Sequence, residues 1–230
     1  LTAWLLLKTQ SPIAPAGALS LAIQAKLLPL IAIPLLVKTL GWKKAFLFGF
    51  LCVLLVVITS PLLWREPERL LNILSSLQLY YGKFEFNGSI YSILRGMGWW
   101  LLGYNPIWWV SKIMMWLTIV VFIIIYRRNH DFLRGFFWLM IAYMLFSAVV
   151  HPWYLTILVA LSPFLPYRFA LVWTALVPLT YHTYTVDPYE QNYVFIAVEY
   201  AAVAGYLLYE MRKDFASVKP LSIAGLFKQA

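Results

Sequence analysis

The amino-acid sequence predicts an all-α fold: a polytopic transmembrane helical bundle with interfacial helices in one long extracytoplasmic loop. Two observations predict this fold. Of the 230 residues, 63% are hydrophobic and 12% are charged, whereas soluble domains carry about 25% charged residues. In addition, several apolar runs of about twenty residues are each long enough to cross the hydrocarbon core of a bilayer. We therefore expect residues 1–230 to form a single transmembrane domain.

Each predicted crossing is an apolar run bounded by polar or proline-containing connectors. The crossings are Gly17–Val37, Ala45–Leu63, Ile107–Tyr126, Phe132–Val150, Trp153–Leu165, Phe169–Tyr184 and Tyr193–Met211. Pro29 and Pro34 each delete a backbone donor, so the first crossing is expected to be kinked. Leu1–Leu7 is expected to be the tail of an earlier span, which makes the chain the C-terminal part of a longer protein.

The segment from Trp64 to Trp109 is rich in both polar and aromatic side chains. Apolar residues at near-helical spacing in Glu66–Tyr81 predict a helix that lies in the membrane interface. Ser89–Leu102 is predicted to be a second such helix, because its aromatic rings favour the headgroup level. If the chain performs chemistry, we expect much of the site in this loop, residues 64–109.

The distribution of basic residues predicts which side of the membrane this loop occupies. When the connectors are assigned alternately to the two sides, one side carries these eleven basic residues: Lys38, Lys43, Lys44, Arg127, Arg128, Arg134, Arg168, Arg212, Lys213, Lys219 and Lys228. The other side carries Lys8, Arg65, Arg69, Lys83 and Arg95. Because cytoplasmic connectors are the more basic ones, we expect the loop outside the cytoplasm and the C-terminus inside. The net charge of +9 then indicates no nucleic-acid partner.

The stretch from Lys83 to Tyr91 alternates polar groups with aromatic anchors. We expect Phe84 and Phe86 to insert at the acyl boundary, while Glu85 and Asn87 remain at the membrane surface. This arrangement is suited to binding a polar headgroup carried on a lipid. An interfacial loop without a ligand explains the same pattern equally well.

His151 immediately precedes Pro152, a residue that is favoured at the first position of a helix. Its imidazole, with Tyr154 in the following turn, is expected near backbone N–H groups that face outward. The helix dipole there favours anions, so a lipid phosphate would fit. The alternative is that the histidine caps the helix.

Charged residues within the predicted crossings need compensation. A lysine near mid-membrane costs about 2.5–3.5 kcal/mol on insertion scales, so Lys26 requires a partner or a polar cavity, and we expect it near an anionic ligand. Glu199 is expected to pair with Lys26 or Lys112. The sequence contains no glycine-rich phosphate loop, no zinc-binding cluster and no serine nucleophile elbow. The single cysteine, Cys52, excludes an intrachain disulfide.

Three stretches carry a family resemblance: AKLLPLIAIPLLVKTLGWKK (25–44), KFEFNGSIY (83–91) and HPWYLTILVALSPF (151–164). They resemble the C-terminal half of GT-C glycosyltransferases, in particular bacterial mannosyltransferase-like proteins that use polyprenol-phosphomannose. The resemblance implies transfer of a hexose, with mannose expected, from a polyprenyl-phosphate donor to an acceptor hydroxyl on the outer face of the bacterial inner membrane.

In such families the general base is a carboxylate in the first outward loop, near the N-terminus. That loop is expected upstream of this chain, because Glu66, Glu68, Glu85 and Asp187 do not match its position. The expected partners are the lipid bilayer and the lipid-linked sugar donor. No cofactor or metal ligand is assigned within the chain, and the need for a divalent metal stays open.

The candidate residues for binding substrate or phosphate are Lys26, Lys83, Glu85, Asn87, Arg95, His151 and Tyr154. Two other functions compete with glycosyl transfer. The first is a carrier or flippase for a lipid-linked or small polar solute, in which Lys26 and Glu199 would be intramembrane coupling residues. The second is a non-catalytic membrane subunit.

Overall fold

The computed structural model of the chain describes residues 12–61, 65–128, 131–185 and 190–212. These residues form ten α-helices and four 3₁₀ segments, and no β-strand occurs among them. The prediction of an all-α fold is therefore confirmed for the described part of the chain. The described helices group into two compact units, one from residues 1–80 and 123–139 and the other from residues 81–122 and 140–230.

Among the described residues, three helices are long and apolar enough to cross a membrane: α4 (Trp42–Thr59), α8 (Ile107–Arg128) and α12 (Tyr193–Arg212). Most of their apolar side chains are exposed, as for Phe46 on α4 and Trp116 on α8. Surfaces so rich in exposed apolar groups require apolar surroundings. The chain is thus a membrane protein by the length and composition of these helices.

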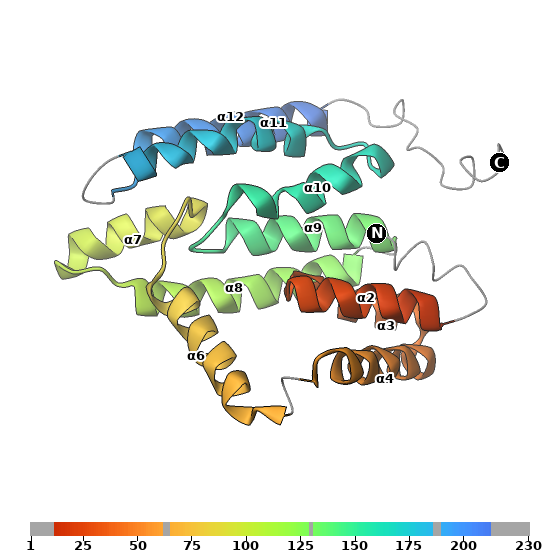
Figure 1. Cartoon of the computed structure of the whole chain (residues 1–230). Coiled ribbons are helices and arrows are strands. Elements are labelled where there is room, and N and C mark those ends of the chain that lie inside the picture. Colours follow the sequence, from red (N-terminus) through yellow and green to blue (C-terminus); the bar gives the residue numbers. More distant parts are fainter. Residues whose placement is uncertain (1–11, 62–64, 129–130, 186–189, 213–230) are drawn as a thin grey trace. The chain divides into compact units, whose positions relative to one another are not determined.

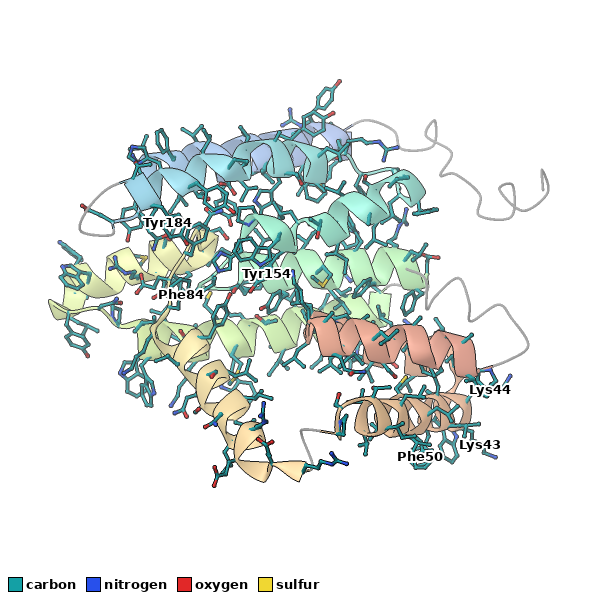
Figure 2. All side chains as sticks on the ribbon, viewed as in Figure 1. Lys43, Lys44, Phe50, Phe84, Tyr154 and Tyr184 are labelled. Carbon is teal, nitrogen blue, oxygen red and sulfur yellow. The ribbon has the colours of Figure 1, made fainter. Side chains whose placement is uncertain are left out.

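The first unit is built on α4. Its other elements in this region are α2 (Ile13–Ala25), η1 (Leu28–Ala32) and α3 (Ile33–Leu40), and both α2 and α3 pack against α4 (Figure 1). Lys43 and Lys44 lie exposed in the first turn of α4, and the apolar Phe50 is exposed two turns later (Figure 2). The surface of α4 therefore changes from basic to apolar along the helix.

The predicted kink in the first crossing is confirmed. The backbone leaves the helical conformation at Lys26, with φ −156° and ψ 141°. Pro29 lies inside the 3₁₀ segment that follows, and Pro34 lies in the first turn of α3. Because each proline lacks a backbone N–H, the segment from 13 to 40 forms two short helices rather than one continuous span.

The second unit contains the following elements: α7 (Ser89–Leu102), the first part of α8, the end of α9 (Phe132–Leu145), η2 (Pro152–Tyr154), α10 (Thr156–Leu161), η3 (Ser162–Phe164), α11 (Phe169–Leu176), η4 (Val177–Thr185) and α12. Helices α11 and α12 lie side by side (Figure 1). Glu210 of α12 caps α11, since its carboxylate accepts hydrogen bonds from the backbone N–H groups of Arg168 (2.7 Å) and Phe169 (3.0 Å).

The predicted crossing Phe132–Val150 is shorter than expected, because α9 ends at Leu145. Beyond it, the hydroxyl of Ser147 bonds locally to the backbone of Val149, which competes with helix formation. The chain then becomes extended and pairs with Phe86, which donates from its N–H to Ala148 O (3.0 Å) and accepts from Val150 N (2.8 Å).

Two further predicted crossings are interrupted. Trp153–Leu165 is divided among η2, α10 and η3, and Phe169–Tyr184 changes from α11 to the 3₁₀ segment η4. A proline stands near the start of each 3₁₀ segment, at positions 152, 163 and 178, where it removes an α-helical hydrogen bond. None of these helices alone has the roughly twenty residues that a crossing requires.

Both helices predicted in the loop 64–109 are present, as α6 (Pro67–Lys83) and α7. Their location at the membrane interface stays a prediction. Helix α7 ends in a left-handed residue, Gly103 (φ +74°), and the chain then folds back so that Pro106 touches Gly98. A Cβ atom on Gly98 would lie 2.4 Å from Cγ of Pro106. The return of the chain from α7 to α8 therefore requires glycine at this position.

We predict that Gly98→Ala lowers the free energy of unfolding by about 1–3 kcal/mol, because the rigid proline ring leaves no space for the added methyl group. Gly96→Ala is the matched control on the same helix, since its Cβ would have no neighbour within 4 Å. This control should be neutral or stabilising by up to about 1 kcal/mol. Thermal unfolding in detergent measures both, and equal effects would contradict the packing argument.

Candidate functional site

An open hollow of about 710 Å³ lies in the second unit, at the end of α6, along α7 and before α12. It is lined by Lys83, Phe84, Glu85, Arg95, Gly96, Trp99, Glu190, Gln191 and Tyr193. Three of the residues predicted to bind substrate, Lys83, Glu85 and Arg95, therefore line the same hollow. Its volume is in the range of small-molecule binding sites.

An ion pair between Arg95 and Glu85 forms one wall of the hollow, with 2.7 Å between Nε and Oε2. The other oxygen of Glu85 accepts a hydrogen bond of 2.6 Å from the Asn105 side chain. Arg95 also donates from Nη1 to the hydroxyl of Tyr193 (2.9 Å). Its guanidinium carbon lies 5.9 Å from the ring centroid of Trp99, a cation–π distance. Arg95 thus connects α7 to the start of α12.

Tyr91 lies buried beside this ion pair. Burial, and next the negative charge of Glu85, raise the pKa of the Tyr91 phenol well above its ordinary value. The phenol is therefore protonated under physiological conditions and stays neutral. Since Tyr91 packs against Val110 and Met114, it also joins α7 to α8 below the hollow.

The charged groups that line the hollow balance one another. Arg95 is neutralised by Glu85, while the exposed Lys83 and Glu190 carry the second positive and the second negative charge. Among the residues that the structure describes, Lys83 forms no ion pair. Its ammonium group is therefore accessible to an anion that enters the hollow.

Asn87 is buried behind the hollow rather than exposed at the membrane surface, so that expectation is wrong. Its backbone is left-handed (φ 52°), a conformation that asparagine tolerates better than most residues. Its N–H donates to Gln191 Oε1 (2.9 Å), its side-chain Nδ2 donates to Glu199 Oε1 (3.0 Å), and its carbonyl accepts from the Tyr200 hydroxyl (2.8 Å). Asn87 therefore joins the segment before α7 to α12.

Glu199 is fully buried on α12. Its Oε1 accepts hydrogen bonds from the Trp173 indole (2.7 Å) and from Asn87 (3.0 Å). Neutral donors occupy that oxygen, and the predicted pairing of Glu199 with Lys112 is wrong. The alternative pairing with Lys26, a residue of the first unit, stays a prediction. The ammonium group of Lys112 instead lies 3.3 Å from the ring centroid of Trp108.

His151 lies in a stack of aromatic rings. Its ring centroid is 4.8 Å from that of Phe86 and 4.2 Å from that of Trp153, and Tyr154 meets it edge-on at 5.6 Å. Phe86 stacks in turn on Tyr184; Tyr154 and Tyr184 are labelled in Figure 2. Phe86 is fully buried in this stack, so its expected insertion at the acyl boundary is wrong.

The position of His151 excludes one of its two predicted roles, helix capping, and weakens the argument for the other, phosphate binding. The side chain makes no capping hydrogen bond to the helix that follows, so the alternative of a helix-capping histidine is wrong. That helix begins as a 3₁₀ segment of three residues, which offers little of the N-terminal dipole expected to attract a phosphate. His151 and Tyr154 do not line the hollow.

Lys26 belongs to the first unit, where it is exposed at the break between α2 and η1. It is the one member of the seven predicted binding residues that lies outside the second unit. Several other residues named from the sequence, Lys8, Trp64 and Asp187 among them, lie outside the described part of the chain.

Several residues of the hollow and its support are not predicted as site residues from the sequence: Trp99, Glu190, Gln191, Tyr193, Asn105 and Trp173. Trp99 is predicted at the headgroup level and Tyr193 at the start of the last crossing, and an aromatic ring in either position has the same local pattern whether or not it lines a ligand site. Gln191 and Asn105 carry no local signal, because their partners are distant in sequence.

Comparison of the chain with protein-family models, with curated proteins and with solved structures finds no match. The length and composition of α4, α8 and α12 place the chain among membrane proteins.

We predict that the Arg95–Glu85 ion pair contributes a coupling free energy of about 1–2 kcal/mol to stability, because both side chains are largely buried. The measurement is a double-mutant cycle of thermal unfolding with Arg95→Gln and Glu85→Gln. The exposed pair Arg69–Glu66 is the control, with an expected coupling of about 0.3–0.5 kcal/mol. Equal coupling in both pairs would refute a structural role for the ion pair in the hollow.

For His151, we predict that replacement by alanine lowers the free energy of unfolding by about 1–3 kcal/mol, because the stack with Phe86 and Trp153 is lost. His151→Phe preserves stacking and should retain most of the stability. Thermal unfolding of both variants checks this. If phenylalanine destabilises as much as alanine, the imidazole contributes by its polar atoms rather than by its ring.

Proposed function

We propose that the chain is part of a membrane glycosyltransferase that transfers a hexose, with mannose as the first candidate, from a polyprenyl-phosphate donor to an acceptor hydroxyl. In this proposal the hollow holds the glycosyl phosphate of the donor. The observation that carries the proposal is the set of groups lining the hollow: two cations, two carboxylates and three aromatic rings.

These groups match the three chemical parts of a glycosyl phosphate. Lys83 and the Nη2 amino group of Arg95 can bind phosphate oxygens, since Arg95 uses Nε and Nη1 for Glu85 and Tyr193. Carboxylate oxygens accept hydrogen bonds from sugar hydroxyls, and Glu190 is exposed in the hollow for this purpose. The rings of Trp99 and Tyr193 offer apolar faces for a pyranose ring.

The reaction would break the bond between C1 of the sugar and the phosphate oxygen, and form a bond between C1 and the acceptor oxygen. The polyprenyl phosphate leaves with the electron pair, and a base removes the acceptor proton. Lys83 and Arg95 would stabilise the charge that develops on the leaving phosphate. Both oxygens of Glu85 are engaged by Arg95 and Asn105, so we do not assign the base to Glu85.

The position of the hollow relative to the membrane is part of the proposal. The exposed Trp99 and Trp100 on α7 and Trp108 and Trp109 at the start of α8 are typical of the headgroup level. Helix α8 continues from there as an apolar helix of 22 residues. A donor anchored by its polyprenyl chain would then present its phosphate to the hollow from the outer leaflet, as the distribution of basic residues also predicts.

The proposal is tested by transfer of radiolabelled mannose from polyprenyl-phosphomannose, using the full-length protein in detergent with acceptor-containing membrane extract. We predict that Lys83→Ala raises the KM for the donor about tenfold, which corresponds to about 1.4 kcal/mol of lost phosphate binding.

Lys112→Ala is the matched control, because its exposed ammonium lies over Trp108 and does not line the hollow. This variant should keep the wild-type KM. Equal effects of the two lysine substitutions would remove Lys83 from the donor site. Failure of the full-length protein to transfer from every polyprenyl-phosphate sugar would refute the proposed function.

A further inference from the structure

The buried contact between Asn87 and Glu199 leaves two oxygen atoms without a hydrogen-bond donor. Asn87 Nδ2 donates to Glu199 Oε1, but Asn87 Oδ1 and Glu199 Oε2 are both buried and have no partner among the described residues. Buried polar atoms are almost always satisfied, because an unmade hydrogen bond costs about 1–3 kcal/mol. Two such atoms on side chains already in contact call for one common explanation.

The surroundings of Glu199 do not favour a negative charge. The side chain is fully buried in an apolar helix, and its donors are the neutral indole of Trp173 and the neutral amide of Asn87. Among the described residues, no lysine, arginine or histidine forms an ion pair with it. A buried charge without a counter-charge is strongly disfavoured, and such a group takes up a proton instead.

We propose that Glu199 is a neutral carboxylic acid that donates a hydrogen bond from Oε2 to Asn87 Oδ1, so that the two side chains form a doubly hydrogen-bonded acid–amide pair. One proton then satisfies both oxygens. The acid supplies one donor and one acceptor, and the amide supplies the complementary acceptor and donor. No cation or additional side chain is needed.

The acid–amide pair positions the hollow. Asn87 is two residues from Glu85 on one wall, and its backbone N–H binds Gln191 on the other wall. Glu199 does not line the hollow, but its hydrogen bond to Asn87 links it to both walls. The pair itself does not depend on what the hollow binds; its role as a positioning element for a glycosyl phosphate rests on the proposed function.

Infrared difference spectroscopy tests the protonation state. Full-length wild-type protein and Glu199→Gln are compared at neutral pH in a detergent without ester groups, so that detergent carbonyls do not interfere. We expect the wild type to show the carbonyl stretch of a protonated carboxyl group, and Glu199→Gln to lose it. Glu68→Gln, at an exposed carboxylate of α6, is the control and should not change this band.

Thermal unfolding tests the geometry of the pair independently of any activity. Glutamine has the same donor and acceptor pattern as the protonated acid, so Glu199→Gln should keep the wild-type Tm, whereas Glu199→Ala should lower it by several degrees. Asn87→Gly tolerates the left-handed backbone but lacks the amide, and should lower Tm as Glu199→Ala does. Combining the last two should cause little further loss.

Two outcomes would overturn the proposal: a wild-type spectrum without the protonated carboxyl band, or a Tm of Glu199→Gln as low as that of Glu199→Ala. The first result would mean that Glu199 is an anion, and the second that glutamine cannot reproduce its hydrogen bonds, so that no acid–amide pair forms. Neither measurement uses sugar transfer, so failure of the proposed function would leave this test intact.

Discussion

The connection between Asn87 and α12 is the interaction on which the second unit depends. Asn87 is a buried residue in a non-helical turn and forms three hydrogen bonds. Its N–H donates to Gln191, its side-chain amide donates to Glu199, and its carbonyl accepts from the Tyr200 hydroxyl. A turn without regular secondary structure must satisfy its backbone groups in some other way when it is buried. Asn87 does this with its N–H and its carbonyl, and Phe86 does so by pairing with the extended chain at residues 148–150. Because the turn behind the hollow is fixed in this way, the hollow can form at the surface.

Local signals in the sequence predicted the two helices of the loop 64–109 and the kink after Lys26, because proline and helical periodicity act within a few residues. The apolar sequence predicted too long a helix at Phe132–Val150 and uninterrupted helices in the two crossings that follow it. An apolar run that ends in Val149 and Val150 has the composition of a membrane helix. Instead, residues 148–150 are extended because they pair with Phe86, more than sixty positions away in the chain. No local sequence pattern predicts a contact between such distant positions.

Only some residues of the candidate site were predicted from the sequence. Lys83, Glu85 and Arg95 were found because charged groups are rare in this chain and stand out near aromatic residues. The alternation of polar and aromatic residues predicted Asn87 at the membrane surface and Phe86 at the acyl boundary, whereas in the structure both side chains are buried within the protein. The lining residues Gln191 and Tyr193 belong to a different part of the sequence, so their membership in the hollow follows from tertiary structure alone.

Helix α12 carries two buried carboxyl groups, Glu199 and Glu210, and both face partners on or beside α11. Eleven residues correspond to about three helical turns, so the two groups lie on one side of the helix and about 16 Å apart along its axis. Sliding or rotation of α12 by a single residue would break both sets of contacts at once. Helices α11 and α12 are therefore held in a single register by two separate sets of buried contacts.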